Sequence, residues 1–231
     1  LSAKAKTDTA TVLLGTATNT QDMTGKVIKQ AEPEALAALS EETVFETIKS
    51  FIGEYEQIPP MFSAIKINGQ KLYNLARRGE VIERPARHCN ILNITVTKME
   101  LPRVNLHVTC SKGTYIRTLC HDIGKKLGVG GCMEKLIRTK VERFDVKESI
   151  SLAQIEEYRD NETLEQYIIP VDEMLDMYSK CIVAENAEKL VYNGNIFTTR
   201  NTLLKMNNED GQTLRVYTHD GNFIGLYVFN A

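Results

Sequence analysis

Apolar and polar residues alternate in the middle of the chain, and the spacing then changes to that of a helix. In residues 104–110 every second position is apolar, which is typical of a strand with one buried face. From Tyr115 to Leu127 the apolar positions recur at intervals of three and four, which predicts an amphipathic helix. Gly113 lies between the two patterns and permits a sharp turn. The pattern therefore predicts a strand that leads directly into a helix.

The same two periodicities predict most of the other elements. Strands are expected over residues 9–14, 27–28 and 91–96, and helices over residues 41–56, 72–77, 150–158, 164–174 and 184–192. Asp220-Gly221 lies between two apolar runs and is a strong hairpin signal. We therefore expect an α+β fold. Residues 1–178 would form a mixed, mainly antiparallel central sheet with flanking helices, and residues 179–231 a small β-rich domain.

Composition narrows the class of protein. A chain of 231 residues can bury a substantial core, and no apolar run reaches the roughly 18 residues of a membrane helix. The first ten residues are polar and do not resemble a signal peptide. The five cysteines form no CxxC pair, and the four histidines are not at ligand spacing. These features favour a cytoplasmic protein without a disulfide framework, metal site or membrane partner.

Charge is unevenly distributed along the chain. The net charge is −2, yet residues 66–87 carry six basic residues against two acids. Residues 112–147 carry nine basic residues against four acids. Two basic blocks on an acidic background can form a phosphate-binding surface. The alternative is that these basic side chains pair with nearby acids.

Arg117 is the first candidate for chemistry. It lies in the first turn of the predicted helix, away from its apolar stripe. An arginine at a strand–helix junction commonly meets an anion or a carboxylate. The alternative is a surface arginine on an amphipathic helix.

Three segments together resemble the TruB family of tRNA pseudouridine synthases, which modify uridine 55 in the T arm. They are QIPPMFSAIKING at 57–69 with its basic continuation to 87, SKGTYIRTL at 111–119, and LIRT at 136–139. The resemblance covers nearly the whole chain. It implies a pseudouridine synthase fold, a PUA-like RNA-binding domain in residues 179–231, and a monomer that binds tRNA without a cofactor or an obligate protein partner.

The resemblance also implies roles for individual residues. Arg117 would pair with the catalytic aspartate, and Tyr115 and Leu136 would line the pocket of the flipped uridine. Residues 57–87 would form an RNA-gripping insertion. Its phosphate-contact candidates are Lys66, Lys71, Arg77 and Arg87.

Two departures from the family pattern bear on activity. The Gly-Thr-Leu-Asp-Pro-like motif that carries the catalytic aspartate does not occur in residues 1–231. Asp8 stands at the position of the family's active-site tyrosine, and an aspartate cannot stack on a base. We therefore expect this chain to lack the nucleophile and to be inactive as it stands. The alternatives are a truncated synthase, a non-catalytic RNA-binding module of the same fold, and a protein-binding scaffold.

Overall fold

The computed structural model describes residues 5–203 and 209–230. Residue contacts divide the chain into two compact units, Leu1–Ser149 and Ile150–Ala231. The domain boundary at residue 178 and the PUA-like assignment of residues 179–231 stay predictions.

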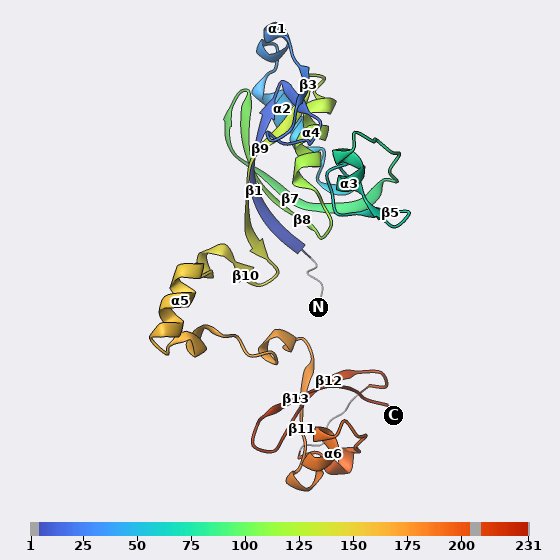
Figure 1. The fold of residues 1–231 in the computed structure, drawn as a ribbon, viewed down its shortest axis with the longest axis vertical. Helices are drawn as coiled ribbons and strands as arrows, with labels where there is room; N and C mark the ends of the chain where they lie inside the picture. Colours follow the sequence, from blue (N-terminus) through green and yellow to red (C-terminus); the bar gives the residue numbers. More distant parts are fainter. Residues whose placement is uncertain (1–4, 204–208, 231) are drawn as a thin grey trace. The chain divides into compact units, whose positions relative to one another are not determined.

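An antiparallel six-stranded sheet forms the centre of the first unit (Figure 1). Its strands, in spatial order, are β10 (Phe144–Asp145), β9 (Gly131–Val141), β1 (Ala5–Leu14), β8 (Arg103–Ser111), β7 (Arg87–Glu100) and β4 (Gly53–Gln57). In β1 and β8 the buried positions alternate with partly exposed ones, as expected for strands with one face on the core. The sheet and its flanking helices confirm the predicted α+β class.

Two helices complete the core of this unit. Helix α2 (Glu41–Lys49) begins at Ser40, whose side chain accepts a hydrogen bond from the Thr43 amide. Helix α4 (Ile116–Lys126) buries Leu119 and Ile123 in the same apolar cluster as Val12 and Leu106 of the sheet. Burying each such side chain contributes about 1.5–3 kcal/mol. This packing fixes the position of α4 against the sheet.

Smaller elements project from this core. Strands β2 (Thr16–Thr18) and β3 (Val27–Gln30) form one hairpin, and helix α1 (Pro33–Ala37) follows it. Strands β5 (Lys66–Ile67) and β6 (Gln70–Lys71) form a second hairpin, followed by helix α3 (Leu72–Arg77). Leu72 and Leu75 of α3 pack on Met61 in a separate small core. The insertion therefore has an apolar centre of its own.

Two sequence predictions need correction, and one strand was not predicted. The helix predicted over residues 41–56 ends at Lys49, because Gly53 adopts a φ of +108° and the chain turns into β4. The segment 131–141, to which the sequence analysis assigned no element, is strand β9. The helix predicted over residues 164–174 is instead two 3₁₀ turns, η2 (Leu164–Tyr167) and η3 (Glu173–Leu175).

The second unit contains a three-stranded sheet in the order β11-β12-β13. Strand β11 (Ser179–Ile182) is parallel to β12 (Thr213–Tyr217), which pairs antiparallel with β13 (Phe223–Val228) across the predicted hairpin. The shorter elements in and before this unit are η1 (Val146–Glu148), α5 (Leu152–Asp160), η4 (Glu185–Ala187), α6 (Glu188–Tyr192) and η5 (Thr199–Asn201). Helix α6 contributes Val191 to a core that includes Cys181 and Val216. None of the helices in the described ranges is long and apolar enough to cross a membrane.

Candidate active site

The junction between β8 and α4 is held by a buried glutamine. Gly113 takes a φ of +84° in the turn, and Tyr115 forms the N-cap of α4. The side-chain amide of Gln57 donates to the Tyr115 carbonyl at 3.0 Å and accepts from the Tyr115 amide at 2.8 Å. Gln57 is only 2% exposed. Because both bonds go to the backbone, they fix where α4 begins and hence where its first turn points.

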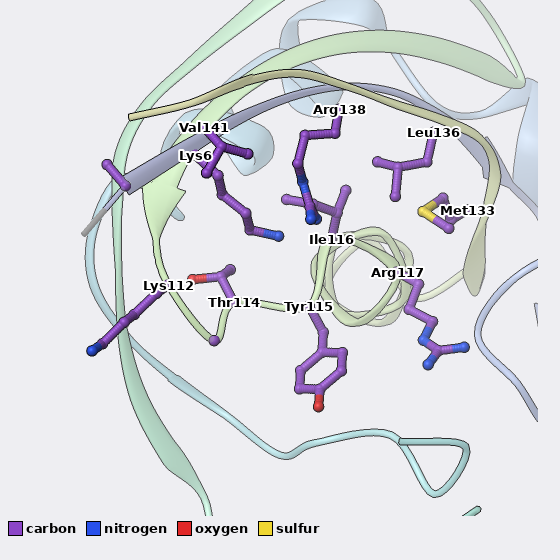
Figure 2. A pocket seen from close by; sticks show the side chains of 12 residues that line it. Lys6, Lys112, Thr114, Tyr115, Ile116, Arg117, Met133, Leu136, Arg138 and Val141 are labelled. Atoms are coloured by element: carbon purple, nitrogen blue, oxygen red, sulfur yellow. The ribbon is translucent and has the colours of Figure 1, made fainter. Parts of the chain in front are cut away.

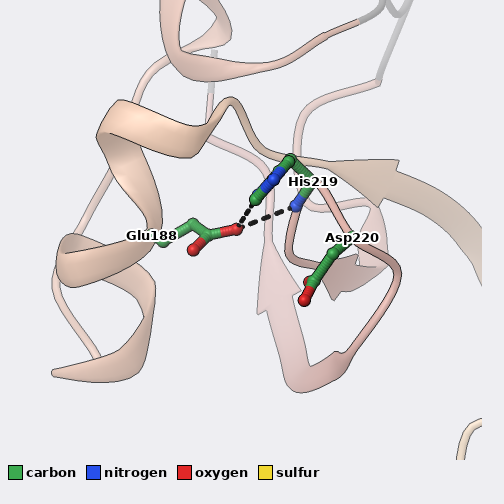
Figure 3. Close-up of side chains that lie close together, drawn as sticks. All are labelled: Glu188, His219 and Asp220. Atoms are coloured by element: carbon green, nitrogen blue, oxygen red, sulfur yellow. Dashed lines mark hydrogen bonds and ion pairs between the residues drawn. The ribbon is translucent and has the colours of Figure 1, made fainter.

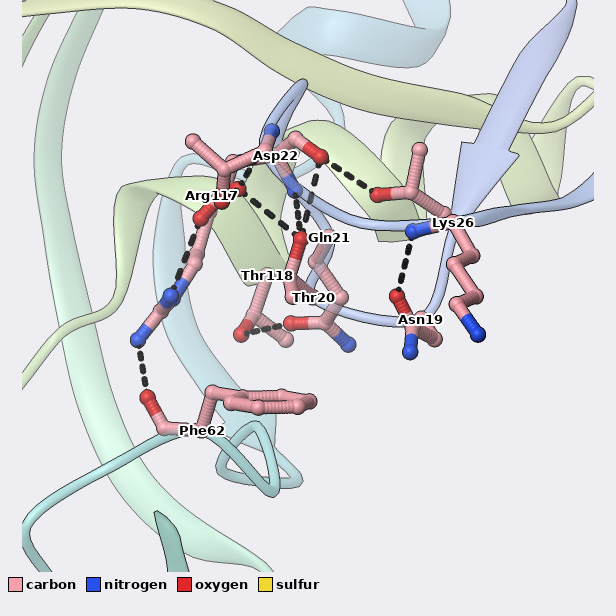
Figure 4. A network of polar contacts seen from close by, with 10 residues as sticks. Asn19, Thr20, Gln21, Asp22, Lys26, Phe62, Arg117 and Thr118 are labelled. Atoms are coloured by element: carbon pink, nitrogen blue, oxygen red, sulfur yellow. Dashed lines mark hydrogen bonds and ion pairs between the residues drawn. The ribbon is translucent and has the colours of Figure 1, made fainter. Parts of the chain in front are cut away.

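Arg117 projects from that first turn into a polar network (Figure 4). Its Nη1 donates to Asp22 Oδ2 at 3.0 Å, and its Nη2 donates to the Phe62 carbonyl at 2.5 Å. The two side chains of the ion pair are only 21% and 15% exposed. Arg117 thus has a carboxylate partner within this chain, which the sequence analysis missed.

Hydrogen bonds hold the Asp22 carboxylate in place. Its Oδ1 accepts from the Thr20 hydroxyl at 2.8 Å and from the Thr24 amide at 3.0 Å. Burial alone would raise the pKa of Asp22, but the bonds from Thr24, Thr20 and Arg117 outweigh it and lower that pKa. Asp22 is therefore held ionised beside the guanidinium. The only sequence signal was an acid in a Thr- and Asn-rich loop.

A cavity of about 510 Å³ opens beside this network (Figure 2). Its lining includes Tyr115, Arg117 and Leu136, three residues that the sequence analysis assigned to one site. Tyr115 and Arg117 come from the start of α4, and Leu136 comes from β9. An aromatic ring and an apolar side chain near a cation suit a planar, polar ligand such as a nucleobase.

Asp8 lies behind the cavity wall and is not among the lining residues. Its side chain is fully buried in β1 and pairs with Lys6 Nζ and Arg138 Nε, each at 3.0 Å. Both of these basic residues line the cavity. Asp8 therefore reaches the site only through Lys6 and Arg138. The position of Asp8 in the family pattern implies a direct substrate contact, and the geometry does not support one.

The four phosphate-contact candidates lie on the insertion and at its end. Lys66 and Lys71 are in the β5–β6 hairpin and line a hollow of about 480 Å³. Arg77, in α3, and Lys71 both approach the ring of Tyr73, at 5.3 and 5.5 Å from its centroid. Arg87 is exposed at the start of β7, opposite Gln57. The structure thus places Lys71 and Arg77 against the Tyr73 ring, Lys66 in the same hollow as Lys71, and Arg87 on the main sheet.

One group of possible metal ligands occurs among the described residues, in the second unit (Figure 3). Glu188, His219 and Asp220 each place a ligand atom within 4.8 Å of the others. Glu188 Oε1 already accepts from the His219 amide at 3.0 Å and lies 2.5 Å from its Nδ1. Asp220 accepts from Thr218 and Asn222. Since these groups satisfy one another, the arrangement fits a tie between α6 and the β12–β13 turn.

That tie predicts a pH-dependent stability. The hydrogen bond that His219 donates to the Glu188 carboxylate raises the pKa of His219 above 6.5. A raised pKa contributes stability that is fully present below about pH 6.5 and is lost as the pH rises through the folded-state pKa. We expect the Tm difference between the native chain and Glu188→Gln to be largest near pH 5.5 and to shrink by pH 9. A difference that grows with pH would contradict the assignment.

Comparison with known proteins places this geometry in a family. Residues 1–116 match the family model described as TruB family pseudouridylate synthase (N terminal domain). Residues 117–176 match that of the tRNA pseudouridylate synthase B C-terminal domain. The fold is thus that of a pseudouridine synthase. The chain belongs to the TruB family.

Curated relatives agree with this membership. The chain is 46% identical over 217 residues to tRNA pseudouridine synthase B of Clostridium tetani, a match that covers 94% of this chain and 72% of the relative. It is 45% identical to the protein of the same name from Lachnoclostridium phytofermentans, over 79% of this chain and 63% of that one. The chain therefore spans about two thirds of the length of these relatives.

Solved structures support the fold. A chain in the crystal structure of a Cbf5-Nop10-Gar1 complex superposes with a TM-score of 0.63 at 23% identity. The match covers 99% of this chain and 60% of the other. A chain of an H/ACA RNP bound to a substrate RNA containing 2'-deoxyuridine gives a TM-score of 0.62 at 19% identity.

Proposed function

We propose that this chain has the uridine-binding site of a tRNA pseudouridine synthase and that its substrate is uridine 55 in the T arm. The observation that carries the proposal is the cavity lined by Tyr115 and Leu136 next to the Arg117–Asp22 pair. A base that is to be modified must leave its stack and enter such a pocket. The names of the relatives supply the tRNA substrate. Monomeric state and cytoplasmic location stay predictions.

The reaction is an isomerisation that needs no external cofactor. The bond between uridine N1 and C1′ breaks, the base turns, and a bond forms between C5 and C1′. The proton on C5 is lost, and N1 is protonated. A carboxylate near C1′ is required as nucleophile or base, and a neighbouring cation keeps it ionised. Arg117 is the cation suited to this role.

Asp22 is not a good candidate for that carboxylate. Its oxygens are already engaged by Thr20, Thr24 and Arg117. We therefore assign it a positioning role: it orients the guanidinium and balances its charge. In our proposal the nucleophile is the aspartate of the family motif, which does not occur in residues 1–231. The chain as given would then bind the uridine without isomerising it.

A single assay separates this proposal from its alternatives. The chain is incubated with T-arm RNA carrying [5-³H]uridine, and tritium release and RNA binding are both measured. We expect binding that weakens with salt and no release of tritium. Release above background would show that the chain contains its own nucleophile. Absence of binding even at low salt would favour a protein-binding scaffold, since phosphate contacts are strongest there.

The insertion provides a second prediction. Lys66→Ala and Arg87→Ala should each weaken T-arm binding and reduce the slope of log K against log salt by about 0.7–0.9, because each removes one phosphate contact. Lys98→Ala is the matched control, since Lys98 lies near the other end of β7 and pairs with Glu100 at 2.8 Å. An unchanged slope in either variant would remove that residue from the interface.

A further inference from the structure

A buried acid between two basic side chains forms one wall of the cavity. Lys6 and Asp8 lie two residues apart on β1, so they share a face of the sheet. Asp8 is paired in register with Arg138 on the neighbouring strand β9. We call these three residues the Lys6–Asp8–Arg138 cluster.

Exposure differs sharply within the cluster. The Asp8 side chain is 0% exposed, whereas those of Lys6 and Arg138 are 13% and 50% exposed. A carboxylate that is fully removed from water needs cationic partners. Asp8 therefore holds both basic groups close together, where they would otherwise repel one another. With the usual charges the cluster carries a net charge of +1.

The basic groups face the cavity. Figure 2 shows the side chains of Lys6 and Arg138 extending from neighbouring strands toward the same end of α4. Arg138 contacts Asp8 through Nε. Among the described residues its terminal nitrogens have no other acceptor. A planar guanidinium with free terminal N–H groups is well suited to bind the oxygens of a phosphate.

We propose that the Lys6–Asp8–Arg138 cluster is a phosphodiester subsite that binds the backbone next to the uridine in the cavity. The single negative charge of a phosphodiester matches the net charge of the cluster. Lys6 and Arg138 contact the phosphate, and Asp8 is a positioning residue that acts through them. This inference rests on the proposed function, because it requires an RNA nucleotide in the cavity.

The test compares normal and neutral linkages in T-arm RNA. One hairpin carries a methylphosphonate 5′ of the target uridine, a second carries it 3′ of the target, and a third carries it in the distal stem. We expect the methylphosphonate at one of the two target linkages to weaken RNA binding by the native chain about fivefold to tenfold. This is the size of effect expected for the loss of a charge-assisted hydrogen bond. The distal linkage should have no such effect.

Variants then assign the effect to the cluster. Arg138→Gln should bind normal RNA more weakly and should no longer distinguish the neutral linkage. Lys6→Gln should distinguish it less than the native chain. Asp8→Asn should also lose discrimination although it adds net positive charge, an outcome that a purely electrostatic role would not produce. Lys98→Gln is the control and should keep the full effect.

The outcomes separate the two proposals. If the native chain binds RNA but ignores both target linkages, or if Arg138→Gln keeps the native discrimination, the subsite is wrong and the proposed function stands. If the native chain does not bind T-arm RNA at all, the proposed function itself fails. Arg138 is half exposed, so its variant should fold even if Asp8→Asn does not.

Discussion

Gly124→Ala should destabilise the first unit by more than about 3 kcal/mol, an effect in the range of severe core overpacking. A Cβ atom at this position would lie 2.2 Å from both Gly130 C and Gly131 N. These are backbone atoms that lead into β9, so no side chain can rotate away. In a free helix the same change would stabilise by about 1 kcal/mol. A loss of unfolding free energy in Gly124→Ala, where a free helix would gain, would therefore show that α4 lies close against β9.

Urea unfolding of the whole chain, followed by a probe of the first unit, measures this effect. Gly225→Ala is the control, because a Cβ there meets nothing within 4 Å, and it should change stability by less than about 0.5 kcal/mol. A Gly124→Ala chain as stable as the native one would show that α4 can move away from β9. Since α4 begins at Tyr115 and β9 carries Leu136, which both line the cavity, a measurable loss of T-arm binding should accompany the destabilisation.

Asp22→Ala should cost about 2 kcal/mol, less than the roughly 3–5 kcal/mol for breaking a fully buried ion pair, because this pair retains some exposure. The variant removes the carboxylate that accepts hydrogen bonds from Arg117, Thr20 and Thr24. The Thr20 hydroxyl keeps one acceptor, the backbone carbonyl of residue 22. A double-mutant cycle with Arg117→Ala should give a coupling energy of about 1–2 kcal/mol. Additive losses would show that the pair contributes nothing beyond its separate contacts.

The contribution of the Arg117–Asp22 pair to folding stability also depends on pH in the acid range. The pKa of Asp22 is lowered from 3.8 in the folded state. Its stability contribution is therefore present above about pH 3.8 and is lost as the pH falls through the folded-state pKa. Asp22→Asn should remove this contribution and flatten the dependence of stability on pH in the acid range.

RNA binding by Arg117→Ala should change little, because the guanidinium faces Asp22 and Phe62 and not the basic insertion hairpin.

The sequence predicted the elements that depend on local pattern. Strand β8, helix α4 and the turn at Asp220-Gly221 have clear periodicity or turn residues, and all three were found. Strand β9 has buried residues at its start and exposed residues at 135–138, where two apolar residues lie between two basic ones, so it lacks the alternation that marks a strand. Strand β9 is stabilised by its pairing with β1, and the residue pattern of β9 alone does not indicate this pairing.

The candidate site was predictable only in part. Tyr115 and Arg117 belong to a specific motif, and Leu136 was placed by resemblance. Asp22 lies 95 positions from Arg117, and Asp8 lies 130 positions from Arg138. Contacts over such distances depend on sheet order and loop path, which neither spacing nor composition encodes. A lone acid in a polar loop gave no reason to select Asp22.

The second bond of Arg117 has a consequence for sequence variation. Its acceptor is the backbone carbonyl of Phe62, so no side chain introduced at position 62 can remove that acceptor. The phenylalanine side chain itself takes no part in this bond. What the bond requires is the backbone path after Pro59-Pro60, whose restricted dihedral angles guide the segment past α4. We therefore expect this bond to persist when only the side chain at position 62 is changed, and to be lost when the two prolines before it are replaced.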